Sequence, residues 1–192
     1  MPQLRKLAGK IKKDHKLARE LFKSNIHEAK ILATIIADKD KLTDKEASQW
    51  AKTFDSWDIV DQCCMNLFWQ SKDCIKKIPE WAKSDQEFIR RTAFSLMAVL
   101  AAKDEEMKDS EFLKFFLLIK KYSTDERNFV KKAVNWALRQ IGKRNKSLNK
   151  AAIKLAKEIA IIGKKKNSKS AKWIAGNALA EIESSKYQSK LK

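Results

Sequence analysis

An aspartate and a tryptophan four residues apart are the side chains best placed for chemistry. Trp57 and Asp61 lie in a stretch with helical periodicity and share one side of that helix. Asp61 falls at the rim of the apolar arc, whereas Asp58 and Gln62 point further toward water. A carboxylate beside an indole at a core edge is partly desolvated, so its charge has strong local effects. Periodicity alone favours a simpler interpretation, in which Asp61 is a buried aspartate that bonds to a neighbouring helix.

A second group of residues forms a basic stripe around a tryptophan. The stripe consists of Lys132, Trp136, Arg139 and Lys143, at spacings of four, three and four, off the apolar face of the same segment. An indole among cations can stack on a nucleotide while its neighbours hold phosphates. The equal alternative is a tryptophan that packs on the next helix under the lysine stems.

A pair of arginines stands in the next candidate helix, over residues 86–102. Arg91 lies opposite Leu100, on a side otherwise made of small residues such as Ser95. Small neighbours allow a close approach by another helix or by a DNA backbone. Arg90 is adjacent, and taken singly such arginines are most often solvated or in simple ion pairs.

Several familiar catalytic patterns are absent from the sequence. There is no P-loop, GxSxG, HExxH or close pair of carboxylates, and His15 and His27 fit surface or helix-end positions. The three cysteines lack CxxC spacing, which indicates neither a disulfide framework nor a zinc site. We therefore expect no metal and no cofactor, and any catalysis must rely on isolated carboxylates and electrostatics.

The net charge of +18 is concentrated at the two ends of the chain. Residues 1–23 carry a net +6, residues 24–130 a net −2, and residues 131–192 a net +14. Such segregation indicates a polyanionic partner. The alternative, a basic solvating tail, suits only the last residues, Ser185–Lys192, because elsewhere the charges are interleaved with apolar residues.

The composition predicts an all-α fold. The 192 residues include only 4 glycines and 2 prolines, and amphipathic segments of about 10–17 residues follow one another through short polar links. These features predict about ten helices in a curved α-solenoid of HEAT-like antiparallel pairs, an α-α superhelix, over residues 1–184. A compact bundle is the alternative. No transmembrane span or signal peptide is indicated, and a cytoplasmic location is expected.

Local signals predict several helix ends. Asp14 is expected to start one helix, and Ser147 and Ser168 (or Ser170) to open the last two helices. Thr43 to Glu46 has the form of a capping box. Gly142 and Gly163 stand where C-terminal glycines are expected.

Taken together, these residues resemble the DNA alkylation repair proteins of the AlkD-like family, from about residue 2 to residue 183. The matching stretches are Pro2–Leu7, His27–Lys30, Phe54–Asp61, Phe88–Ala93 and Asp125–Arg139. The Trp-Asp-x-Val-Asp and Lys-Ala-x-x-Trp-x-Leu-Arg elements are the most specific of these. The resemblance implies a curved array of HEAT-like helix pairs whose basic concave face grips duplex DNA, and removal of positively charged N3- and N7-alkylated purines.

The resemblance also implies roles for individual residues. It places the catalytic carboxylate at Asp61, the aromatics beside the damaged nucleotide at Trp57 and Trp136, and an arginine against the DNA backbone at Arg91. Further backbone contacts are expected from the neighbouring cations. These are Arg90, Lys132, Arg139, Lys143 and Arg144.

The expected function is that of a monomeric, metal-free DNA glycosylase acting on double-stranded DNA, associated with the nucleoid if the source is bacterial. One alternative is a non-catalytic DNA-binding relative that recognises distorted or branched DNA, and another is a HEAT-type protein-interaction scaffold. Family members begin with further helices before the Pro-x-Leu-Arg element, which here starts at residue 2. Either the start lies upstream, or one end of the solenoid and part of the DNA grip are shortened.

Overall fold

The computed structural model describes residues 1–189 and 191, and these residues form helices and no strand. The helices are α1 (Pro2–Ile11), α2 (His15–Lys23), α3 (His27–Ile36), α4 (Asp44–Lys52), α5 (Trp57–Asn66), η1 (Phe68–Gln70), α6 (Lys72–Lys76), α7 (Ile78–Lys83), α8 (Glu87–Lys103), α9 (Asp109–Tyr122), α10 (Asn128–Gly142), α11 (Lys146–Lys165), α12 (Lys169–Ile182) and α13 (Ser185–Gln188). The all-α prediction is therefore confirmed.

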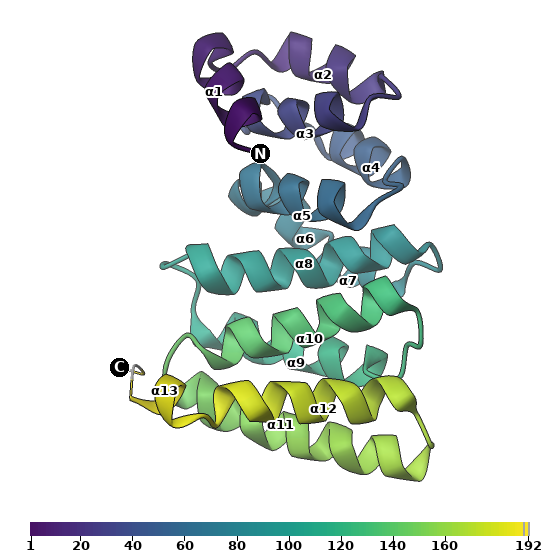
Figure 1. The fold of residues 1–192 in the computed structure, drawn as a ribbon, viewed down its shortest axis with the longest axis vertical. Helices are drawn as coiled ribbons and strands as arrows, with labels where there is room; N and C mark the ends of the chain where they lie inside the picture. Colours follow the sequence, from purple (N-terminus) through teal and green to yellow (C-terminus); the bar gives the residue numbers. More distant parts are fainter. Residues whose placement is uncertain (190, 192) are drawn as a thin grey trace.

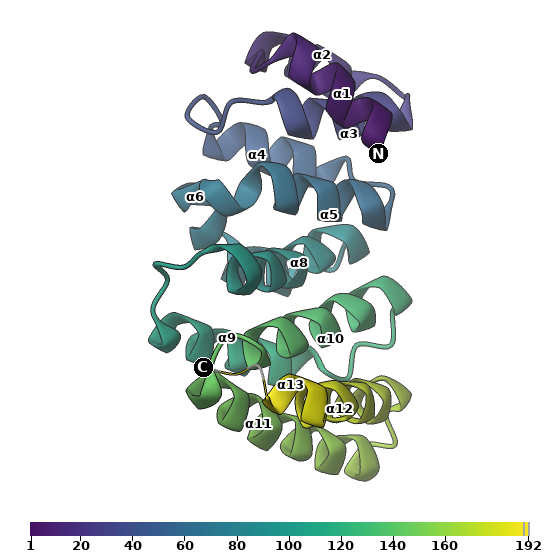
Figure 2. The ribbon, with the colours of Figure 1, turned by 60° about the vertical axis from the view of Figure 1, so that its left-hand side comes forward.

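The helices stack in two layers along one long axis (Figure 1). We call α3, α5, α8, α10 and α12 the front layer, because they lie toward the viewer in Figure 1. Within it, α5 packs on α3 and α8, and α10 packs on α8 and α12. The back layer contains α4, α6, α7, α9 and α11, and Figure 2 shows it on the left, opposite the front layer. This elongated α-solenoid excludes the compact-bundle alternative.

The central helix of the front layer, α8, is buried along most of its length. Every residue from Arg91 to Ala101 is buried, including Phe94, Leu96 and Leu100, which are fully enclosed. Burial of large apolar side chains is the main stabilising contribution in such a stack. Because α8 is packed on both sides by α5 and α10, polar side chains on it are fixed between those two helices.

Several helix starts follow the local sequence signals. Asp14 accepts a hydrogen bond from the backbone N–H of Leu17 (2.9 Å), Thr43 accepts one from that of Glu46 (3.2 Å), and Ser168 caps α12. The prediction for Ser147 is wrong, because Asn145 is the residue that caps α11. The asparagine side chain reaches the N–H three residues on and so satisfies a free donor of the first turn.

The two glycines expected at helix ends have a different role. Gly142 is the last residue of α10, but Gly163 lies inside α11, and neither glycine has a positive φ. A Cβ on Gly142 would lie 2.9 Å from the Cβ of Ala152, and one on Gly163 would lie 2.9 Å from the backbone nitrogen of Lys172. They therefore allow α11 to approach α10 and α12 closely, which corrects the prediction that both serve as C-terminal caps.

The segment expected to be a basic tail is partly folded. Within Ser185–Lys192, residues 185–188 form α13, and Gln188 donates hydrogen bonds to the carbonyl of Ile182 (2.6 Å) and to Asn149 (3.0 Å). Leu191 is buried, while residues 190 and 192 lie outside the described residues. Among the described helices, none is both long and apolar enough to cross a membrane.

Candidate functional site

Asp61 lies between two helices of the front layer and is bonded on both carboxylate oxygens. It sits one turn into α5 and is only 8% exposed. Its Oδ1 accepts a hydrogen bond from Ser95 Oγ (2.8 Å), and its Oδ2 accepts one from Arg91 Nη2 (2.7 Å), both from α8. This geometry matches the simpler interpretation of the sequence, an aspartate that bonds to a neighbouring helix. Each oxygen nevertheless keeps a second lone pair that can face a ligand.

Arg91 joins three helices around this carboxylate. Besides Asp61 it donates from Nη1 to the carbonyl of Phe129 at the start of α10 (2.7 Å). Its guanidinium carbon lies 5.8 Å from the ring centroid of Trp57, within the range of a cation–π contact. Arg91 is 5% exposed, so its charge serves the pair with Asp61 and does not stand free for a phosphate. We call Trp57, Asp61, Arg91 and Ser95 the aspartate cluster.

Burial sets the electrostatics of the aspartate cluster. Desolvation raises the pKa of Asp61 above its usual value, although Arg91 and Ser95 stabilise the carboxylate. Asp58, on the same helix, behaves differently. Burial works in the same direction there, but hydrogen bonds from Ser56 and His27 hold the pKa of Asp58 below its usual value. The two aspartates of α5 therefore have distinct environments, and only Asp61 combines burial with an arginine partner.

The two tryptophans expected beside a nucleotide lie on the helices that flank α8. Trp57, the first residue of α5, is 51% exposed, which is unusual for so large an apolar side chain. Trp136 on α10 is partly buried and packs against the core. Exposure of Trp57 leaves its ring available for stacking, whereas Trp136 combines packing with some free surface.

Four of the five further cations expected to meet DNA phosphates are held by groups of the protein. Arg90 pairs with Asp125 (2.6 Å) and lies over the Tyr122 ring. Arg139 and Lys143 both pair with Glu181 on α12. Arg144 donates to the carbonyls of Ala101 and Met107, at 3.3 and 3.2 Å. Lys132 is exposed and makes no ion pair among the described residues.

One exposed aromatic residue was not singled out from the sequence. Trp173 on α12 is 41% exposed, and Lys131 Nζ on α10 lies 5.5 Å from the centroid of its ring. The sequence does hold a signal for it, since Trp173 stands beside Lys172 and departs from the buried series of α12. That series is Ala171, Ile174, Ala175, Ala178 and Ile182. A tryptophan and a lysine of adjacent front-layer helices thus meet at the surface.

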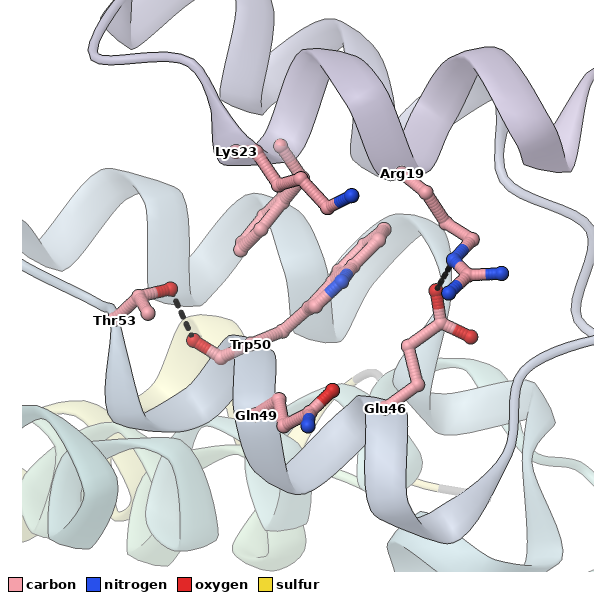
Figure 3. Close-up of a pocket in the computed structure, with 7 residues that line it drawn as sticks. Arg19, Lys23, Glu46, Gln49, Trp50 and Thr53 are labelled. Atoms are coloured by element: carbon pink, nitrogen blue, oxygen red, sulfur yellow. Dashed lines mark hydrogen bonds and ion pairs between the residues drawn. The ribbon is translucent and has the colours of Figure 1, made fainter.

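A separate hollow between α2 and α4 is a poor candidate for a ligand-binding site (Figure 3). Its floor is formed by Phe22 and Trp50, which stack with ring centroids 3.9 Å apart. Glu46 on its rim is held by His15 (3.0 Å) and Arg19 (3.5 Å). The hollow measures about 150 Å³, which is smaller than the several hundred cubic ångströms typical of small-molecule sites. We interpret it as a shallow gap left where two helices pack together.

The cysteines and possible metal ligands offer no competing site. Cys63, Cys64 and Cys74 are buried free thiols; burial raises the pKa of the first two well above the usual range and that of Cys74 to about 11. Thiols of this kind are poor nucleophiles at neutral pH. Within residues 1–189 and 191, no three His, Cys, Asp or Glu side chains are grouped so as to hold a metal ion.

The fold and the aspartate cluster define a helical-repeat protein in which a buried aspartate–arginine pair joins neighbouring helices. Comparison with protein families identifies the group to which it belongs. The model of the DNA alkylation repair enzyme family matches residues 1–180, and the chain belongs to that family. No curated protein matches the chain.

A solved structure shares the fold. It is described as representing "a new family of proteins related to the HEAT-like repeat DNA glycosylases with affinity for branched DNA structures". The two chains align with a TM-score of 0.73 and 22% identity, over 82% of this chain and 68% of the other. At this identity the likeness establishes the HEAT-like architecture alone.

Proposed function

We propose that this protein is a DNA glycosylase that hydrolyses the N-glycosidic bond of positively charged N3- or N7-alkylated purines in duplex DNA. The single observation that carries the proposal is Asp61, a carboxylate held at 8% exposure by Arg91 and Ser95 beside the half-exposed Trp57. Membership of the DNA alkylation repair family supports a nucleic-acid substrate.

One carboxylate suffices because the substrate already carries the charge that makes the base leave. The glycosidic bond breaks with its electron pair going to the base, so a cationic alkylpurine departs as a neutral molecule without a general acid. The sugar becomes oxocarbenium-like, and Asp61 stabilises this positive charge electrostatically. Water then adds to C1′ and loses its proton to Asp61 or to solvent. The step is related to glycoside hydrolysis by two carboxylates, with the acid omitted.

Arg91 and Ser95 act in this proposal as positioning residues. Each binds one oxygen of Asp61 and keeps the carboxylate ionised and oriented despite burial. Because Arg91 also binds the carbonyl of Phe129, it ties this orientation to the start of α10. The ring of Trp57 contributes its π face to the same developing positive charge.

Substitution of Asp61 tests the proposal against a neighbouring aspartate. We expect Asp61→Asn to abolish release of N7-methylguanine or 3-methyladenine from methylated duplex, while duplex binding is largely retained. Asp58→Asn is the matched control, because it removes a carboxylate one turn away whose partner is His27. Normal release by Asp61→Asn, with both variants folded by circular dichroism, would show that Asp61 is not the catalytic group.

A second candidate is a non-catalytic protein that recognises distorted or branched DNA. The observation that favours it is the occupation of both Asp61 oxygens by α8 side chains, which is also what a purely structural aspartate shows. The related solved structure is described as having affinity for branched DNA. An assay of base release by the wild-type protein separates the candidates, since only the first forms abasic sites in methylated duplex.

A further inference from the structure

The back-layer helix α11 carries a dense group of lysines along its length. Residues 146–166 contain seven lysines and one glutamate. Four of the lysines, at spacings of four, four and three, fall on one face of the helix. We call this set the α11 lysine face. It consists of Lys146, Lys150, Lys154 and Lys157, all of which are exposed.

The α11 lysine face points away from the helices that α11 packs against. The buried side of α11 contacts α9, α10 and α12. That side consists of Leu148, Asn149, Ala152, Leu155, Ala156, Ile159 and Gly163. At 100° per residue, the centre of this buried set lies roughly opposite Lys150 and Lys154. The helix α11 belongs to the back layer (Figure 2), whereas the aspartate cluster lies on α5 and α8 of the front layer.

The charges on this face are largely uncompensated. Lys157 forms an ion pair with Glu183 (3.1 Å). Glu158, the acidic residue of α11, forms an ion pair with Lys120 of α9 (2.7 Å) and is not available to the lysine face. Lys146, Lys150 and Lys154 have no carboxylate within 4.0 Å among the described residues. In the front layer, by contrast, most of the cations expected to bind phosphates form ion pairs with acidic side chains of the protein. The α11 lysine face therefore presents three lysines without acidic partners on one side of a single helix.

Solubility and helix stability do not explain this arrangement. A terminal repeat needs a polar outer face, but either sign of charge or a mixture would serve. The first turn of α11 contains no acidic residue and begins with Lys146, where the helix dipole disfavours a cation. The nearby Asp109 is engaged with the side chain of Asn145. The cluster is electrostatically unfavourable within the isolated protein and becomes favourable against a polyanion.

We infer that the α11 lysine face is a second duplex-binding surface, which holds a DNA arm other than the one lying on the front layer. The inference rests on the proposed DNA-binding function. The 20 residues of α11 span about 30 Å, close to one turn of B-DNA, and lysines four residues apart are separated by about 6 Å along the helix. A straight duplex bound to the front layer leaves this face free for the second arm of a branched or sharply bent substrate.

The test compares a four-way DNA junction with a linear duplex of one arm's sequence. The variant is Lys146→Gln/Lys150→Gln/Lys154→Gln. The matched control is Lys45→Gln/Lys52→Gln/Lys83→Gln, which removes the same charge from exposed back-layer positions on α4 and α7. Affinity for each DNA is measured across a salt series, together with release of N7-methylguanine from the linear duplex.

We expect the α11 variant to bind the junction about tenfold more weakly, with the slope of log K against log salt reduced in magnitude by about 2.7. Linear-duplex affinity and base release should equal those of the wild type and the control. Unchanged junction affinity, an equal loss for linear duplex, or an equal loss in the control would overturn the inference. If base release is absent in the wild type, the glycosylase proposal fails while the junction comparison remains decisive for α11.

Discussion

The aspartate cluster and the α11 lysine face use charge in opposite ways. Asp61 and Arg91 are at most 8% exposed and bind each other, Ser95 and a backbone carbonyl. Lys150 and Lys154 are exposed and lack a carboxylate partner among the described residues. A buried pair fixes geometry, because either charge left alone there is very unfavourable. An exposed row contributes little to folding but attracts phosphates.

This difference changes the meaning of the net charge. The net charge of +14 over residues 131–192 suggests one basic DNA-binding surface that includes the stripe around Trp136. In the structure Glu181 compensates two cations of that stripe, and Lys132 stays exposed without an ion pair among the described residues. A row of three further unpaired lysines lies on α11. The buried charges of the aspartate cluster therefore lie in the front layer, whereas the row of unpaired lysines on α11 lies in the back layer.

The largest expected effect distinguishes the two regions by stability. Arg91→Met leaves Asp61 and the carbonyl of Phe129 buried without their partner, so we expect a loss of about 3–5 kcal/mol in the free energy of unfolding. Lys154→Met removes the same charge from the exposed face and should change stability by less than about 0.5 kcal/mol. Urea denaturation of both variants measures this, and equal losses would contradict the contrast.

A smaller effect is expected from the packing that turns the lysines outward. Gly163→Ala places a Cβ 2.9 Å from the backbone nitrogen of Lys172, so α11 and α12 must separate, with a loss of about 1–3 kcal/mol. Gly176→Ala on α12 is the control, because its Cβ meets nothing within 4 Å and alanine favours the helix by about 1 kcal/mol. Thermal unfolding should shift in opposite directions, and destabilisation by both variants would contradict this packing.

The smallest expected effect is a shift in the pH dependence of base release, which tests how the aspartate cluster holds its carboxylate. In the proposed mechanism base release needs ionised Asp61. Because burial raises the pKa of Asp61, activity should fall with decreasing pH at a value above the usual 3.8 of an aspartate. Ser95→Ala removes a hydrogen bond that favours the carboxylate and should move this acid limb further upward. Single-turnover release across pH measures the limb, corrected for spontaneous depurination. An unmoved limb in Ser95→Ala would contradict the assignment of Ser95 as a positioning residue.

The fold was largely predictable from sequence because helix formation depends on local patterns. Scarce glycine and proline, amphipathic periodicity and caps such as Asp14 and Thr43 are all local signals. Gly163 shows where local signals fail, since a helix end and a close helix contact both favour glycine. Only the position of α12 beside α11 distinguishes these two reasons.

The candidate site was predictable in part. The four-residue spacing of Trp57 and Asp61 placed both on one side of α5, with Asp61 at the edge of the core. The partner of Asp61 could not be assigned by periodicity, because Arg91 is 30 residues away and reaches it through helix packing. The same limit applies to Arg139 and Lys143, whose shared partner Glu181 comes from the next front-layer helix.

The sequence by itself determined the helices, their amphipathic faces and the segregation of charge, because these depend on residue type and on spacings of three to four. Tertiary structure decided which charges are paired and which remain free. Ion pairs form across helices that are far apart in the chain, and their strength depends on burial that only packing creates. That is why Asp61 and Arg91 became one buried unit while the lysines of α11 remained exposed.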